Sequence, residues 1–129
     1  LLNEDYVGYA GEPVAFNIQE IISKRRENAA YLINELKSFS GVKLWRDIVS
    51  INDVPMFVPI LVDSQIRNDL KSALVKENIY CPVHWPKSVL VPQEYAVNDL
   101  YERELSLICD QRYGLKEMQF QVETIKQSI

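Results

Sequence analysis

The sequence predicts an α+β fold of the two-layer α/β kind, in which a small antiparallel or mixed sheet of three to four strands is covered by helices and preceded by a long N-terminal helix. Three features indicate this class: a long helical spacing of apolar residues near the start, short apolar runs in the middle, and a second helical pattern at the end. The chain has 129 residues, 47% hydrophobic and 25% charged, which suits one domain with its own core. We expect an irregular N-terminal segment over 1–12 and one domain over 13–129.

The first element is predicted to be a long helix. Pro13 suits the first turn of a helix, and Gly41 follows the last apolar position and would end it. The apolar residues between them lie on one helical face: Val14, Ile18, Ile21, Ile22, Ala29, Leu32, Ile33, Leu36 and Phe39.

Two strands and a helix are expected next. Residues 42–47 alternate apolar and polar side chains, and residues 55–62 are almost wholly apolar, so both stretches are typical of strands. Asp63 or Ser64 can cap a helix with apolar positions through Leu74, and Asn78 can end it in the left-handed conformation. A third strand over 79–84 would follow.

The last part of the chain is expected to add a helix, a strand and a closing helix. The complete predicted order is long helix, two strands, helix, strand, helix, strand, helix. Three prolines make residues 81–93 an extended loop, because proline lacks an amide donor and restricts the residue before it. We expect a short helix over about 96–104, a strand over 105–110, and a closing helix with apolar spacings of three and four up to Ile129.

Composition excludes several classes of function. The chain has 14 basic and 18 acidic residues, a formal charge of −4, and no basic surface pattern typical of a nucleic-acid partner. Its apolar runs are far shorter than a membrane span, and no secretion signal is visible, so we expect a cytoplasmic protein. None of its four glycines forms a phosphate-binding pattern, and no serine lies in the nucleophile elbow of hydrolases.

Cys81 and Cys109 each lie in an apolar segment, so we interpret them as buried, reduced thiols. Cys81 and His84 also have the C-x-x-H spacing of zinc ligands, and Cys109 or Asp110 could supply a further ligand. With one histidine in the chain and no second closely spaced pair, this metal signal is weak, and we assign no metal.

Three residues are candidates for substrate binding. His84 and Trp85 lie in the rigid, aromatic stretch Tyr-Cys-Pro-Val-His-Trp-Pro, which could present an imidazole and an indole to a ligand. Alternatively, Trp85 and Tyr80 could anchor the loop on the core while His84 forms a hydrogen bond with a nearby carbonyl. Arg112, between a strand and a helix, could bind an anion or carboxylate, face solvent, or pair with Asp110.

Four segments taken in order carry a family resemblance: KRRENAAYL at 24–32, PMFVPI at 55–60, IYCPVHWP at 79–86 and LSLICDQRY at 105–113. The series resembles the C-terminal small domain of fold type I PLP-dependent aminotransferases, in the DegT-like sugar aminotransferase family, over nearly all of the chain after residue 13. In that family a helix leads out of the large domain into an antiparallel sheet with helices on one side.

The resemblance implies a homodimer in which pyridoxal 5'-phosphate forms a Schiff base with a lysine of the large domain. The small domain closes one wall of the cleft over the amino donor or keto sugar, and His84 and Trp85 match the loop that approaches that cleft. None of the lysines here matches the cofactor lysine: Lys24, Lys37, Lys43, Lys71, Lys76, Lys87, Lys116 and Lys126. We therefore expect no catalytic or cofactor-binding residue in this chain, and an inactive fragment of a longer transferase, since residue 1 is Leu rather than Met.

Other interpretations stay open at this stage. The parent enzyme could be a PLP-dependent dehydratase of the same family rather than an aminotransferase. The chain could instead be a freestanding small-molecule-binding or interaction domain without catalysis. It could also bind an intact aminotransferase subunit through the surface that would face its own large domain, in which case apolar residues would be exposed.

Overall fold

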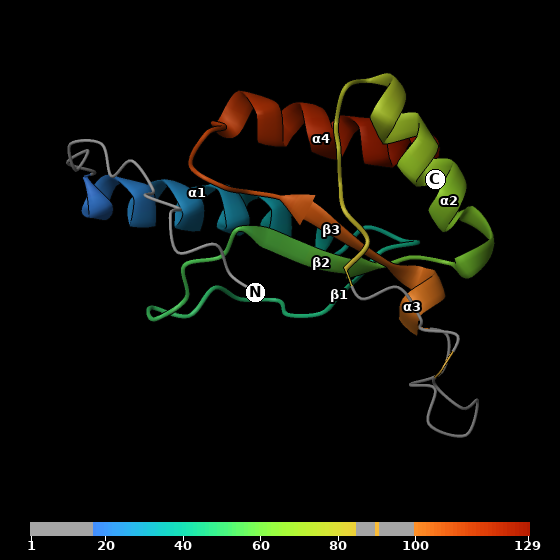
Figure 1. The fold of residues 1–129 in the computed structure, drawn as a ribbon, viewed down its shortest axis with the longest axis horizontal. Helices are drawn as coiled ribbons and strands as arrows, with labels where there is room; N and C mark the ends of the chain where they lie inside the picture. Colours follow the sequence, from blue (N-terminus) through green and yellow to red (C-terminus); the bar gives the residue numbers. More distant parts are fainter. Residues whose placement is uncertain (1–16, 85–89, 91–99) are drawn as a thin grey trace, which may run out of the picture.

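The computed structural model describes residues 17–84, 90 and 100–129 (Figure 1). Its elements are α1 (Ile18–Leu36), β1 (Lys43–Leu44), β2 (Phe57–Leu61), α2 (Ser64–Lys76), α3 (Leu100–Arg103), β3 (Glu104–Ile108) and α4 (Leu115–Ser128). This arrangement confirms the predicted α+β class with a long helix before the sheet. Within the described ranges, no helix combines the length and apolar character needed to cross a membrane.

The sheet has three strands in the order β1-β2-β3, and both pairs are antiparallel. Val58 lies opposite Leu107, and Ile60 lies opposite Leu105. All four side chains are buried, so they form one face of the sheet, because side chains alternate between the two faces of a strand. The sheet therefore has one core face and one face that carries the intervening residues.

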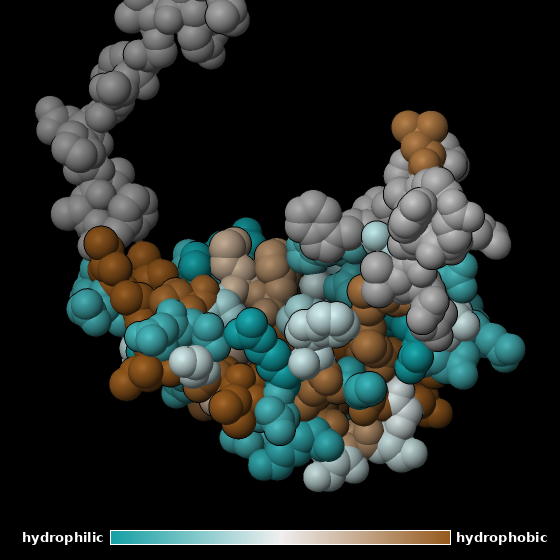
Figure 2. All heavy atoms as spheres, turned by 90° about the horizontal axis from the view of Figure 1, so that it is seen from below, coloured by the Kyte–Doolittle hydropathy of each residue, from teal (hydrophilic) through white to brown (hydrophobic). Residues whose placement is uncertain are grey.

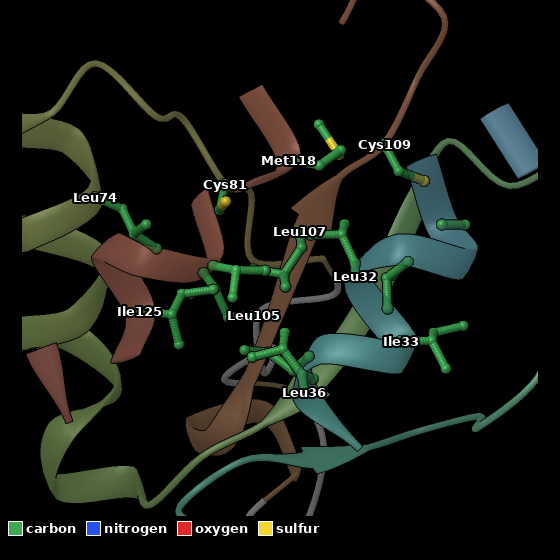
Figure 3. Packing of buried hydrophobic residues seen from close by; sticks show 14 of the residues in the cluster. Leu32, Ile33, Leu36, Leu74, Cys81, Leu105, Leu107, Cys109, Met118 and Ile125 are labelled. Carbon is green, nitrogen blue, oxygen red and sulfur yellow. The ribbon is translucent and has the colours of Figure 1, made fainter. Parts of the chain in front are cut away.

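Helices α1, α2 and α4 cover the core face, and α4 packs against both of the others (Figure 1). Figure 3 shows Leu32 and Leu36 from α1, Ile125 from α4 and the strand residues Leu105 and Leu107 converging between the elements. The buried hydrophobic residues come from every layer: Ala29, Leu32, Ile33, Leu36, Val58, Ile60, Val62, Leu70, Leu74, Cys81, Leu105, Leu107, Cys109, Met118, Val122 and Ile125. Their burial is the main source of stability for this fold.

Helix α1 begins after Asn17, whose side-chain oxygen accepts a hydrogen bond from the amide of Glu20 at 3.2 Å. The helix ends at Leu36, three residues before the predicted end, and turns follow as far as Gly41. Gly41 has a φ of +96°, and a Cβ at this position would lie 2.7 Å from Cγ2 of Ile129. Glycine is therefore required both by the backbone conformation and by the close approach of the C-terminal residue.

Helix α2 follows the sequence prediction. Asp63 caps it by accepting a hydrogen bond from the amide of Gln65 at 2.8 Å. Asn78 has a φ of +62°, so it ends this segment in the left-handed conformation, as predicted.

Strand β1 is much shorter than the predicted 42–47, and Pro59 explains why. The amide of Trp45 donates to the carbonyl of Pro59 at 3.3 Å, so these residues face each other where the ladder would continue. Two antiparallel residues at such a position normally exchange two hydrogen bonds, but proline has no amide to return the second. The ladder therefore stops after Leu44.

The predicted strand over 79–84 is wrong, although the segment does run beside β3. The carbonyl of Pro82 accepts from the amide of Ser106 at 3.0 Å. Pro82 has no amide, and the amide of His84 donates to the carboxylate of Glu104 at 3.0 Å instead of to a backbone carbonyl. A regular ladder cannot form, and the segment covers the edge of β3 without joining the sheet.

The remaining elements agree with the sequence in kind but differ in length. Strand β3 starts one residue earlier and ends two residues earlier than the predicted 105–110, and α4 confirms the closing helix. The expected helix over 96–104 is described only as α3, since residues 96–99 lie outside the described residues. Most of the expected loop over 81–93 also lies outside them.

Candidate functional site

The sheet face opposite the helices carries an open hollow of about 510 Å³. Figure 2, which looks from below the view of Figure 1, shows apolar side chains reaching the surface between hydrophilic ones on this side of the molecule. The hollow combines apolar and aromatic walls with a few polar groups, which is the composition typical of small-molecule sites. Its lining residues are Trp45, Met56, Phe57, Pro59, His84, Leu100, Glu104 and Ser106.

The alternation of the strands places these side chains. In β2, Phe57 and Pro59 take the face opposite to Val58, which is buried in the core. Ser106 pairs with Pro59 across the strands and shares its face. The open face of the sheet therefore forms the floor of the hollow, and residue 84 reaches it from the segment beside β3.

His84 takes part in a compact polar network. Its Nδ1 lies 2.8 Å from Oγ of Ser106, and Oγ of Ser106 donates to Oε1 of Glu104 at 2.5 Å. Oε2 of the same carboxylate accepts from the backbone amide of His84 at 3.0 Å. The ring also packs edge-on against Phe57, with centroids 4.6 Å apart and an interplanar angle of 67°. Both the backbone and the ring of His84 are therefore held in place.

This network is not a hydrolase triad, although it contains a serine, a histidine and a carboxylate. In a triad the imidazole lies between the nucleophilic hydroxyl and the carboxylate. Here Ser106 lies between the imidazole and the carboxylate, and only 1% of the residue is exposed. Ser106 therefore supports His84 rather than attacking a substrate.

Arg112 pairs with Asp110, which is one of the roles left open by the sequence. Nε of Arg112 donates to Oδ1 of Asp110 at 3.0 Å, and one terminal nitrogen donates to Oδ2 at 2.6 Å. The Arg112 guanidinium holds the pKa of the Asp110 carboxyl below its usual range. The guanidinium carbon also lies 5.5 Å from the ring centroid of Tyr113.

His84 and Arg112 lie toward opposite ends of β3. His84 contacts Ser106 in the strand, whereas Arg112 follows its last residue, Ile108. His84 lines the hollow, and Arg112 is not among the residues that line it. The two candidates therefore do not form one site, and Trp85, the third, lies outside the described residues.

The connection after β3 is fixed to α1 by Asn28, which is fully buried. Its side-chain nitrogen donates to the carbonyls of Tyr113, Asp110 and Cys109 at 2.9, 3.1 and 3.3 Å. Its side-chain oxygen is buried without a hydrogen-bond partner. Asn28 thus sets the position of the Asp110 and Arg112 pair relative to the helices.

Both cysteines are buried free thiols, as predicted. Burial raises the pKa of Cys81 to about 11 and that of Cys109 to about 12. Sγ of Cys81 contacts Oε1 of Gln121 on α4 at 3.2 Å, whereas His84 contacts Ser106 on the open face, so the C-x-x-H pair does not converge. In the described part of the chain, no three His, Cys, Asp or Glu side chains gather to hold a metal ion.

The described residues do not fit the cofactor that the resemblance implies. A Schiff-base lysine needs a buried pocket that depresses its pKa. Lys24 and Lys126 instead form surface pairs with Glu27 and Glu35, and no described lysine lines the hollow. Pyridoxal 5'-phosphate therefore has no covalent anchor among the described residues.

A second surface feature lies beside the hollow, in the connection 45–56. Arg26 of α1 holds this connection by donating to the carbonyls of Asp53, at 2.8 Å, and Ile51. Ile51 and Ile48 are nevertheless 81% and 70% exposed, and Trp45 is 57% exposed. Such a group of exposed apolar side chains is typical of a surface that faces another protein part or a ligand.

The sequence did not identify Ser106, Glu104 and Phe57 as site residues. A signal was present in β3, where Glu104 and Ser106 alternate with buried leucines and so mark a face of the strand that does not meet the core. Their contact with His84 bridges segments that are far apart along the chain. Only the folded structure brings them together.

Comparisons with solved structures find the same fold in one part of several enzymes. The protein-family models and the curated proteins gave no match. Among solved structures, the aminotransferase TlmJ from Streptoalloteichus hindustanus aligns with a TM-score of 0.70 at 15% identity, over 85% of this chain and 32% of that one. Helicobacter pylori PseC, an aminotransferase involved in pseudoaminic acid biosynthesis, aligns at 0.67 with 21% identity, over 83% and 32%.

The E coli GDP-4-keto-6-deoxy-D-mannose-3-dehydratase, solved with bound hydrated PLP, aligns with a TM-score of 0.61 at 17% identity, over 84% of this chain and 31% of the enzyme. The chain thus spans about a third of the length of the solved structures that it matches. The resemblance drawn from the sequence is confirmed at the level of the fold, which this chain shares with one part of two aminotransferases and of a dehydratase solved with PLP.

Proposed function

We propose that this chain is the C-terminal small domain of a PLP-dependent aminotransferase and forms one wall of its active-site cleft. The observation that carries the proposal is the open face of the sheet, where the hollow holds His84 in a fixed polar network. Among the described elements, the helices α1, α2 and α4 cover the other face, which leaves this face to meet a second domain. The fold similarity to two aminotransferases over 83–85% of the chain supports the same role.

The lining of the hollow supports a proposal for the substrate class. Phe57 and Trp45 offer aromatic surface, and His84 and Glu104 offer polar atoms beside it. A sugar presents the same mixture, with apolar C–H faces and hydroxyl groups around its rim. We therefore propose a keto sugar, or a related carbonyl compound, as the amino acceptor, with an amino acid such as glutamate as the donor.

The cofactor would be held by another part of the protein. Pyridoxal 5'-phosphate supplies an electron sink for amino transfer when it is bound. The residues of this chain would contribute walls, hydrogen bonds and exclusion of water, and the isolated chain would be inactive. We further propose a homodimeric, cytoplasmic enzyme, and the two free thiols suit a reducing compartment.

The first experiment measures the size of the natural protein that contains these residues. Lysate of the source is separated by size, and the fraction with the peptide over 79–85 is identified by mass spectrometry. A band about three times the size of this 15.0 kDa chain is expected, since the matched structures are about three times as long. That band should show the absorbance of bound PLP; a band near 15.0 kDa would refute the proposal.

The second experiment replaces His84 in the natural enzyme. His84→Ala removes one hydrogen-bonding group from the cleft wall, worth about 1 kcal/mol, so kcat/KM should fall roughly fivefold. The control is Asn34→Ala, on the exposed side of α1, which should leave kcat/KM unchanged. Unchanged kinetics in folded His84→Ala would limit His84 to a structural role.

A dehydratase of the same fold is an alternative for the whole enzyme, because one matched structure is a dehydratase. A non-catalytic interaction domain is the second candidate, and it is favoured by the exposed side chains of Trp45, Ile48 and Ile51. The reaction that the natural protein catalyses distinguishes a dehydratase from an aminotransferase. The size measurement tests the non-catalytic interaction domain, since a freestanding domain would migrate near 15.0 kDa.

A further inference from the structure

We propose that Ser106 and Glu104 are positioning residues that hold His84 in the Nδ1–H tautomer, so that its Nε2 faces the hollow as a hydrogen-bond acceptor. This inference deepens the proposed function and rests on it for the nature of the ligand. The tautomer itself follows from the network alone.

The argument begins at Glu104. A carboxylate has no proton to give and can only accept hydrogen bonds. Its two oxygens accept from two donors, Oε2 from the backbone amide of His84 at 3.0 Å and Oε1 from the hydroxyl of Ser106 at 2.5 Å. The amide cannot reverse its role, so the carboxylate is fixed in this orientation.

Ser106 transmits this constraint to the ring. Its hydroxyl has one proton, and that proton points to Glu104, because two lone pairs 2.5 Å apart would otherwise repel each other. Oγ therefore offers only a lone pair to Nδ1 of His84, 2.8 Å away. Nδ1 must be the donor, and the neutral ring carries its proton there. Because Ser106 is only 1% exposed, water does not compete for this hydroxyl.

The other nitrogen is then left with a free lone pair. Nε2 lies at the end of the ring away from the backbone, and no described residue forms a hydrogen bond with it. The edge-on contact with Phe57 fixes the plane of the ring, and the ring lines the hollow. The geometry therefore presents Nε2 to a ligand as an acceptor.

An acceptor at this position selects the chemistry of its partner. It bonds a hydroxyl or ammonium group of a bound molecule, whereas a carbonyl or phosphate oxygen would meet a lone pair and be disfavoured. With a sugar in the cleft, Nε2 would recognise one hydroxyl group. Ser106 and Glu104 would then affect specificity without touching the substrate.

The tautomer can be measured directly because His84 is the only histidine in the chain. Nitrogen-15 NMR distinguishes a protonated from an unprotonated ring nitrogen. The spectrum is recorded on the 129-residue chain at mildly alkaline pH. We expect the Nδ1–H form in roughly tenfold excess, the preference that one net hydrogen bond supplies. A majority of the Nε2–H form would overturn the proposal.

Two variants test the cause. Ser106→Ala removes the acceptor for Nδ1–H, and Glu104→Gln introduces an amide that can donate to Ser106 and reverse its hydroxyl. Both should lower the Nδ1–H excess by roughly the same tenfold factor. Ser72→Ala and Glu102→Gln, at exposed positions, are the controls and should keep the wild-type tautomer.

The two proposals fail in distinguishable ways. If folded Ser106→Ala keeps the wild-type tautomer ratio, the positioning role is wrong, whatever the size and cofactor of the natural protein. If the ratio changes as expected but the natural protein carries no PLP, the positioning stands and the proposed aminotransferase role falls. Amide spectra of each variant report whether the fold is retained, and a Glu104→Asp variant provides a second test should Glu104→Gln not fold.

Discussion

Replacing Asn28 by Ala should destabilise the chain more than any surface change, because the amide serves three backbone carbonyls at once. The carbonyl of Asp110 keeps a second donor, the amide of Tyr113 at 3.3 Å, so the loss falls mainly on the carbonyls of Cys109 and Tyr113. Each buried carbonyl left without a donor costs about 1–3 kcal/mol. Loss of the unpartnered Asn28 oxygen offsets part of this cost, which leaves an expected destabilisation of about 2–4 kcal/mol.

Urea unfolding followed by circular dichroism measures this difference as a lower midpoint at an unchanged m value. The control is Asn34→Ala, an asparagine of the same helix that is exposed, and its effect should stay within about 0.5 kcal/mol. The assignment of Asn28 as the anchor of the β3–α4 connection is refuted if both variants unfold at the same urea concentration.

Three further predictions concern other parts of the molecule. Arg112→Gln should lower stability at neutral pH, because Arg112 lowers the pKa of Asp110 in the folded chain. The stability that Arg112 adds is present above the ordinary Asp pKa of about 3.9 and is lost as pH falls through the lower folded pKa. The melting temperatures of the wild-type chain and the variant should therefore converge as pH is lowered. Cys81 and Cys109, with pKa values raised to about 11 and 12, should resist a thiol reagent at mild alkaline pH until urea unfolds the chain, and equal rates in native and unfolded protein would contradict their burial. Gly41→Ala should cost about 1–2 kcal/mol in the same urea assay because of its positive φ, and a neutral effect would show that the turn can rearrange.

The sequence predicted those features that depend on a few neighbouring residues. The Asp63 cap and the left-handed Asn78 were recognisable because both act within a few residues of the helix that they bound. The core helices were recognisable from their apolar spacing. Strand lengths were not, because the end of β1 is set by Pro59, a residue of the next strand that meets Trp45 only after folding.

The candidate site shows the same limit. The sequence pointed to His84 because it is a single histidine in an aromatic, proline-rich stretch, and the structure places it in the hollow. It left several roles open for Arg112; the structure shows the ion pair with Asp110, and substrate binding by Arg112 stays a prediction. The partners of His84, Ser106 and Glu104, could not be assigned, because their contact depends on how the segment beside β3 lies against the strand.

The borders of the sheet have a consequence for self-association. A sheet grows by adding a strand of another chain wherever an edge offers a run of free amide and carbonyl groups. Here β1 is two residues long and stops at a proline of its neighbour, while β3 is covered by the segment that carries Pro82. Among the described residues, neither border offers another strand a regular run of hydrogen bonds. This arrangement disfavours association of two copies edge to edge through the sheet.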